Sequence, residues 1–135
     1  MVEEDELQAL TLPEEGFIWL DITGTPRAGP LAALGANFAI HDLALEDVVN
    51  HGQRPKLDDY NDRLFTILTR PRWHNDDLHL DQVNLFLGSH FVISISSTTT
   101  DPFAAVRSRL QEHSGSFLNR GEAYLLHILI DMTID

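Results

Sequence analysis

The chain has 135 residues, 43% of them hydrophobic and 22% charged, as expected for a single globular domain with its own hydrophobic core. Its 21 acidic and 9 basic side chains give a formal net charge of −12. This argues against nucleic acid as a partner, because phosphate binding needs a basic surface, and it leaves cations or basic proteins. The absence of cysteine excludes disulfides, thiolate nucleophiles and cysteine-based zinc sites.

No targeting or membrane-spanning segment is evident. The first ten residues, MVEEDELQAL, are acidic and lack the positive flank and apolar run of a signal peptide. No window reaches the roughly 18 consecutive apolar residues of a membrane span. We therefore expect a polar segment over residues 1–16 followed by a soluble domain over residues 17–135.

The first predicted elements are a strand and a short helix. Residues 17–20 (FIWL) form an apolar run between a glycine and an aspartate, which is typical of a buried strand. Pro30 suits the first position of a helix, with Leu31 and Leu34 on its apolar edge. Gly35 is expected to end this helix.

The polar stretch over residues 41–60 predicts a second helix and then a strand. Asp42 is placed to cap the N-terminus of the helix. Pro55 imposes an extended path on its neighbour, so the chain should continue as a strand from Lys56. Three apolar residues lie three and four positions apart on one helical face: Leu45, Val48 and Val49.

Two hairpins are predicted next. The first pairs residues 56–60 with residues 64–69, and the second pairs residues 82–87 with residues 91–95, because both stretches carry apolar residues with strand-like spacing. The intervening residues 70–77 break the pattern and are expected to be a connection.

Two helices complete the predicted fold. Asp101 as a cap and Pro102 at the first helical position start one of them. The last segment, residues 121–135, is apolar over most of a helical circumference, so it should lie deep in a core or against a partner. It lacks a stop signal, which suggests a helix cut at Asp135. Strands punctuated by helices predict a mixed α/β layered domain.

The candidate metal ligands are concentrated between residues 74 and 81. Oxygen-rich sets favour magnesium or calcium, and imidazole shifts the preference toward zinc. The spacing matches no established metal motif, so the alternative is a solvated turn whose Asn and Asp residues serve turn geometry. The candidate ligands are His74, Asn75, Asp76, Asp77 and His79.

Motifs of the common enzyme classes are missing. The sequence has no G-x-S-x-G elbow, no Walker loop, no dinucleotide-binding glycine motif and no H-E-x-x-H. We therefore predict that the chain is not an enzyme.

Several segments resemble, in the same order, the N-terminal cytoplasmic domain of the CorA family of divalent metal ion transporters. The combination of HDLALEDV with QRPK is the most specific of them. The matching segments are residues 19–21 (WLD), 41–50 (HDLALEDVVN), 53–57 (QRPKL), 82–83 (QV), 86–88 (FLG) and 124–131 (YLLHILID), with Asp135.

The resemblance implies an α/β/α domain with a mixed parallel and antiparallel sheet flanked by helices. It places this domain on the cytoplasmic side of the cell membrane, with the long helix and the transmembrane segments of the same protein lying beyond this chain. It also implies a homo-oligomer, pentameric in the family, whose neighbouring domains bind Mg²⁺, or Zn²⁺ or Co²⁺, at a regulatory site. One acidic residue of that site lies in the loop formed here by residues 73–77, where Asn75 stands at the acidic position, followed by Asp76 and Asp77.

Three alternatives remain open from the residues. The His74 and His79 pair suits a zinc-transporting relative of the same fold. Residues 74–81 could also serve a metal-dependent hydrolase. A third possibility is a purely structural oligomerisation module, in which the apolar helix over residues 121–135 makes the contacts and no metal binds.

Overall fold

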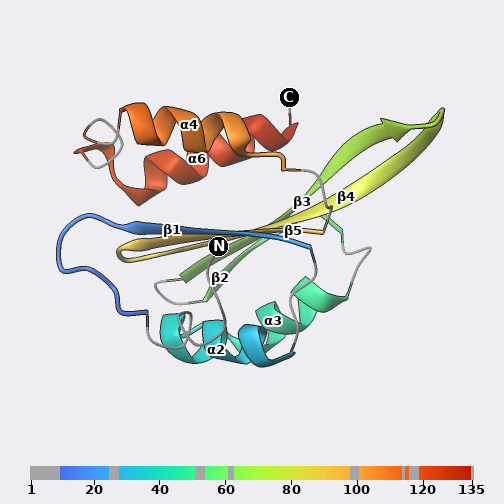
Figure 1. Ribbon diagram of the computed structural model, residues 1–135. Helices are drawn as coiled ribbons and strands as arrows, with labels where there is room; N and C mark the ends of the chain where they lie inside the picture. Colours follow the sequence, from blue (N-terminus) through green and yellow to red (C-terminus); the bar gives the residue numbers. More distant parts are fainter. Residues whose placement is uncertain are drawn as a thin grey trace.

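A computed structural model of the chain describes the layered arrangement shown in Figure 1. The protein forms one central sheet with helices packed on both of its faces. The described residues are 10–24, 28–50, 54–60, 63–97, 101–113, 115 and 119–134.

The sheet has five strands in the order β1-β5-β4-β3-β2. β1 lies parallel to β5, and the other three neighbouring pairs are antiparallel, so the predicted mixed sheet is confirmed. Both predicted hairpins are confirmed as well. The strands are β1 (Ile18–Thr23), β2 (Lys56–Tyr60), β3 (Arg63–His74), β4 (Asp77–Gly88) and β5 (Phe91–Ser96).

Helices cover the sheet in two pairs. α2 (Ala28–Phe38) and α3 (Asp42–Val49) pack on one face, and α4 (Ala104–Glu112) and α6 (Glu122–Ile134) pack on the other (Figure 1). The predicted α/β/α layering is therefore confirmed. It follows from the alternation of side chains along each strand, because each face of the sheet carries its own apolar set.

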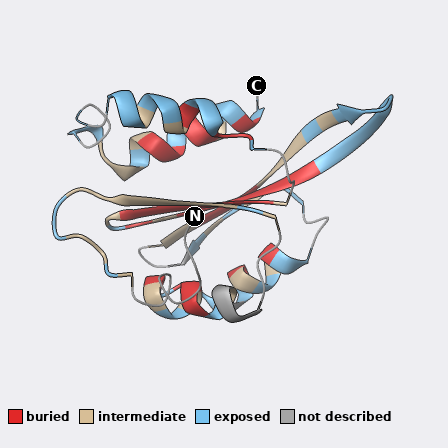
Figure 2. Cartoon of the chain, in the orientation of Figure 1, coloured by how far each residue is buried: buried red, intermediate tan, exposed pale blue. Residues whose placement is uncertain are grey.

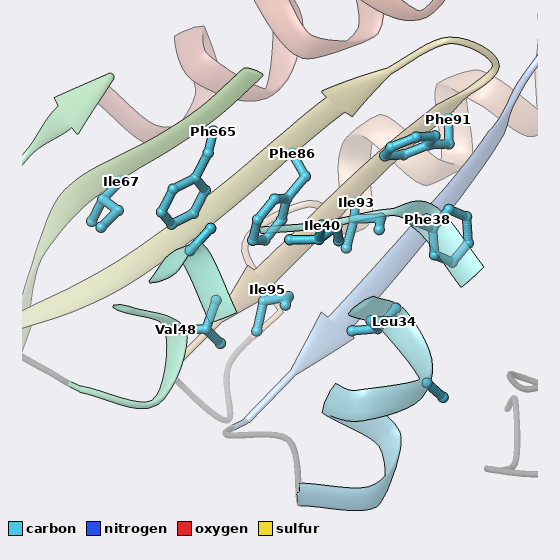
Figure 3. Packing of buried hydrophobic residues seen from close by; sticks show 12 residues of the cluster. Leu34, Phe38, Ile40, Val48, Phe65, Ile67, Phe86, Phe91, Ile93 and Ile95 are labelled. Carbon is cyan, nitrogen blue, oxygen red and sulfur yellow. The ribbon is translucent and has the colours of Figure 1, made fainter. Parts of the chain in front are cut away.

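Two hydrophobic clusters hold these layers together (Figure 2). The first lies under α2 and α3, where the rings of Phe65 and Phe86 stack with their centroids 4.5 Å apart and Phe38 packs on Phe91 at 5.0 Å (Figure 3). The second lies under α4 and α6 and joins Phe103 to residues of β4, β5 and α6.

The first helix does not end at Gly35 as predicted. α2 continues to Phe38, and the chain leaves it at Ala39 with a positive φ of 53°, where the Ile40 N–H donates to the Gly35 carbonyl at 3.2 Å. A Cβ on Gly35 would lie 2.7 Å from Leu45 Cδ1. The glycine therefore permits the close approach of α2 and α3 rather than marking a helix end.

The cap of α3 also differs from the prediction. His41 occupies the N-cap position with extended backbone, and its Nδ1 accepts a hydrogen bond from the Leu43 N–H at 3.1 Å. Asp42 is the first helical residue. Residue 42 thus lies in the first turn of α3 rather than at its cap.

The largest correction concerns residues 70–77, which are strand and turn rather than a connection. β3 runs on to His74 and β4 begins at Asp77, so their pairing extends to the His74–Asp77 pair. Only Asn75 and Asp76 form the turn, with φ of 50° and 66°. Positive φ at both central residues defines a type I′ turn, which matches the twist of the strands that it joins.

Both predicted C-terminal helices form, but the predicted start of α4 is wrong: its N-cap is Phe103 without a side-chain cap, and Pro102 lies in a turn before the helix. The Asp101 carboxylate accepts a hydrogen bond from the Phe103 N–H at 3.3 Å, just before α4 begins. α6 buries one side against the second cluster, whereas His127 and Asp131 are exposed and lie 3.4 Å apart. The side chain of His127 therefore lies outside the core. The predicted cut at Asp135 lies outside the described residues.

A candidate metal site on a projecting hairpin

The end of the β3–β4 hairpin projects beyond the rest of the sheet (Figure 1). The pairing of β2 with β3 reaches only to Ile67, and the pairing of β5 with β4 starts at Val83. Between these limits, and within the described ranges, β3 and β4 pair only with each other. We call residues 70–81 the arm. Figure 2 shows that most of its length is exposed.

The arm has two chemically different faces, because side chains alternate along each strand and paired residues share a face. One face is an apolar strip in the register of the core residues Phe65 and Phe86. The strip consists of Pro71, Trp73, Leu78 and Leu80. The opposite, charged face consists of Arg70, Arg72, His74, Asp77, His79 and Asp81.

Three of the five predicted ligands lie on the charged face at the tip. His74 pairs with Asp77 across the hairpin, and the rings of His74 and His79 approach edge to face with centroids 6.0 Å apart. All three side chains are exposed. Two imidazoles and one carboxylate on one face are donors that suit zinc, cobalt or similar ions.

The other two predicted ligands, Asn75 and Asp76, form the turn itself. Asn75 Nδ2 lies 3.2 Å from His74 Nε2. Within the described part of the chain, no three His, Asp or Glu side chains already converge closely enough to hold an ion. The tip therefore holds no preformed metal site, and ion binding there would need side-chain rotation or donors from another molecule.

A partly buried ion pair braces the base of the arm. Arg72 Nε donates to Asp81 Oδ2 at 2.8 Å, with a second contact from Nη2 to Oδ1 at 3.4 Å. This hydrogen bond to the Asp81 carboxylate raises the pKa of Arg72. Because Asp81 is buried and bound to arginine, its oxygens are already engaged and are poor candidates for a metal ligand.

A second link joins the base of the arm to the helical layer. Gln82 Nε2 donates to the Asp47 carbonyl of α3 at 3.0 Å and to Asn84 Oδ1 at 2.9 Å. The carboxylate of Asp47 in turn pairs with Lys56 of β2, which also contacts Asp58 at 3.1 Å. The hydrogen bond to Asp47 is the main cause of a raised pKa for Lys56. The contacts of Asp47 with Gln82 and Lys56 therefore fix α3 on the sheet.

Sequence reasoning missed a partly buried polar network that joins β1, β5 and α4. Trp19 Nε1 donates to Ser94 Oγ at 2.9 Å, and that hydroxyl donates to Asp21 Oδ1 at 2.7 Å. Arg107 pairs with Asp21 and also with Asp101. The signal was available in the WLD strand, where an aspartate inside an apolar strand needs a buried partner. The network fixes α4 on the sheet.

In the part of the chain that the structure describes, every helix is too short or too polar to cross a lipid bilayer.

Comparison with known proteins places the chain in a family. The family described as "CorA-like Mg2+ transporter protein" matches residues 14–135. The "Cobalt/magnesium transport protein CorA" of Thermotoga maritima is 33% identical over 119 residues, covering 87% of this chain and 34% of that protein. The chain thus spans about a third of the length of this relative.

Solved structures show the same fold. The complete CorA magnesium transporter of Methanocaldococcus jannaschii superposes with a TM-score of 0.74 at 15% identity, covering 92% of this chain and 39% of that chain. The soluble domain of CorA from the same organism gives 0.64 at 16% identity, covering 87% and 46%. The family match extends over nearly all of the described fold, including the sheet, both helical layers and the arm. The chain therefore belongs to the CorA-like family of magnesium transporters.

Proposed function

We propose that residues 17–135 are the regulatory and assembly domain of a divalent metal cation transporter, positioned on the cytoplasmic side of the membrane. The observation that carries this proposal, beyond family membership, is the charged tip of the arm. It holds His74, Asp77 and His79 on one exposed face, clear of the body of the domain. A partial donor set in that position is accessible to a neighbouring copy.

The electrostatics of the chain supports regulation between copies. Each copy carries a formal charge of −12, so identical domains brought together by oligomerisation, in a pentamer or another ring, repel one another. A divalent cation held between two tips would offset part of this repulsion. Domains held together and domains moved apart then differ in their affinity for the cation. Cation binding therefore shifts the equilibrium between these two arrangements.

The donor set also bears on which ion is sensed. Mg²⁺ prefers oxygen ligands in octahedral geometry, and Asp76 and Asp77 are the exposed carboxylates at the tip. Imidazole favours Zn²⁺ and Co²⁺, and the close approach of His74 and His79 gives these ions the advantage. A zinc-transporting relative of the same fold is therefore the second candidate function.

Calorimetric titration of the chain with MgCl₂, CoCl₂ and ZnCl₂, combined with sedimentation, tests the proposal. We expect weak binding by the isolated chain, on the order of millimolar for Mg²⁺, because one copy supplies only part of a shell. Zn²⁺ and Co²⁺ should bind more tightly and increase the mass of the sedimenting species.

Two substitutions make this test specific. His79→Ala should weaken Zn²⁺ binding at least tenfold, whereas His113→Ala, which removes an exposed imidazole at the C-cap of α4, should leave it unchanged. Micromolar Mg²⁺ binding by the monomer, or equal effects of the two alanine variants, would contradict the proposal.

A further inference from the structure

We infer that the apolar strip of the arm is a contact surface for a second copy of this chain. This inference deepens the proposed function and rests on it for the identity of the partner. The strip lies on the face opposite His74, Asp77 and His79. Cation binding and docking are thus assigned to different faces of one hairpin and can be tested separately.

The exposure of the strip is the first observation. Trp73 is 72% exposed, Leu78 53% and Leu80 67%, although they continue the face on which the nearby β3 and β4 side chains are buried. Among the described residues, the helical cover on this face ends with α3. Large apolar side chains that gather on one exposed face mark an interaction site more often than scattered ones do.

The free edges of the arm are the second observation. Neither β2 nor β5 pairs with residues 70–81, so the arm is a two-stranded ribbon. Such a ribbon is marginally stable in water without a third element covering its apolar face. The Arg72–Asp81 pair fixes the base, whereas the Trp73–Leu78 pair further out has water on one side. A protein surface over the strip would supply the missing layer.

The size of the strip limits what the partner can be. Its three large side chains expose roughly half of the ~800 Å² that each partner contributes to a standard interface. The strip is therefore the apolar centre of a contact that must extend onto adjoining surface, and an isolated pair of chains should associate weakly. A contact repeated between identical copies in a ring compensates for this weakness, because each copy is held twice.

The charge of the arm agrees with a second copy as the occupant. Residues 70–81 carry two arginines and three aspartates, a net charge of −1, and all of these charged residues except Asp76 in the turn lie on the face opposite the strip. The strip itself consists of uncharged side chains, so it adds no charge repulsion to a contact with an acidic copy. Burial of the strip would also place the acidic tip at the boundary between copies, where the proposed cation site needs it.

Fluorescence of Trp73 in metal-free buffer tests the docking. The chain has two tryptophans, so Trp19→Phe leaves Trp73 as the only one. We expect its emission to shift to shorter wavelength and its quenching by iodide to fall as the chain concentration rises from about 1 μM to about 1 mM. Leu80→Ser should raise the concentration needed for this change at least tenfold.

Leu57→Ser is the matched control, because Leu57 is 65% exposed on β2, away from the strip. This variant should show the same change in Trp73 fluorescence, at the same chain concentration, as the parent chain. If Trp19→Phe perturbs folding, a Leu78→Cys variant labelled with an environment-sensitive dye gives the same readout, since the chain has no other cysteine. Trp73 that stays quenchable at every concentration, or equal effects of the two serine variants, would overturn the inference.

The two proposals fail in different ways. If Zn²⁺ changes the oligomeric state while Trp73 remains exposed, the docking surface is wrong and the cation site stands. If Trp73 becomes covered without metal but neither Zn²⁺ nor Mg²⁺ binds, the docking surface stands and the regulatory function is wrong.

Discussion

β3 and β4 belong to two regions with opposite surroundings. Within the body, Phe65, Phe86 and their neighbours are buried beneath helices on both faces of the sheet. In the arm, the same two strands keep the same register and the same alternation, but Trp73 and Leu80 lie in water. A strand of this sheet can therefore form without being covered by helices along its whole length. What the cover decides is whether an apolar face stabilises this domain or is left for another molecule.

The largest expected contrast is between two aromatic residues on the same face of β3. Phe65→Ala should lower the free energy of unfolding by about 3–5 kcal/mol, because it empties a core site against Phe86. Trp73→Ala should lower it by less than about 1 kcal/mol, since only the cross-strand contact with Leu78 is lost. Urea denaturation of both variants at a concentration where the chain is monomeric measures the difference. Similar losses would mean that the arm is covered within one copy.

A smaller effect is expected from the partly buried network under α4. Asp21→Ala should cost about 2–3 kcal/mol, because it removes the acceptor for the buried Ser94 hydroxyl and a partner of Arg107. Thermal denaturation checks this value. The double variant Asp21→Ala with Arg107→Met should recover part of the loss, because no guanidinium then faces the emptied Asp21 site, and the other partner of Arg107, Asp101, is exposed to water.

At the base of the arm, substitution should change local rather than global stability. Asp81→Asn weakens the contact with Arg72, and only the arm depends on this contact. We expect faster amide exchange over residues 70–80 and an unchanged exchange rate for the amides of β5. Faster exchange throughout the sheet would show that the arm and the body unfold as one unit.

The smallest effect concerns pH. The hydrogen bond to Asp47 raises the pKa of Lys56 above its unfolded value, so this pair stabilises the fold fully below about pH 10.4 and loses its contribution as the pH rises through the raised pKa. Melting temperatures measured between about pH 9 and pH 11.5 should fall less steeply for Lys56→Met than for the parent chain. The two curves should differ only slightly, because Lys56 is partly exposed.

The layered fold could be predicted from the sequence because apolar periodicity is a local signal. It located β2, β5 and α6 and indicated a mixed α/β layered domain, whereas the two helical layers were implied by the family resemblance. It failed for residues 70–77, since the charged and apolar faces of an exposed ribbon alternate without the buried run that marks a core strand. It also failed at Gly35, because the contact with Leu45 is made by residues ten positions apart on two helices.

The candidate site was predicted only as a set of residue types. The cluster around His74 was evident in the sequence, but the assignment of each side chain to a face required the hairpin register and the two-residue turn. Asn75 illustrates the difference between a role inferred from sequence and a role inferred from backbone geometry. The family resemblance places it at an acidic ligand position, whereas its φ of 50° gives an independent reason for the residue, because asparagine tolerates left-handed backbone better than most residues.

The parallel pairing of β1 with β5 has a consequence for the order of folding. The neighbouring hairpins join residues close in sequence, whereas Asp21 and Ser94 meet across a separation of 73 residues. Contacts over such distances are slow to form, because a long loop must close before any of them stabilises the chain. We therefore expect β3, β4 and β5 to assemble first and β1 to join last. The arm would then be exposed during the whole period in which β5 has not yet paired with β1.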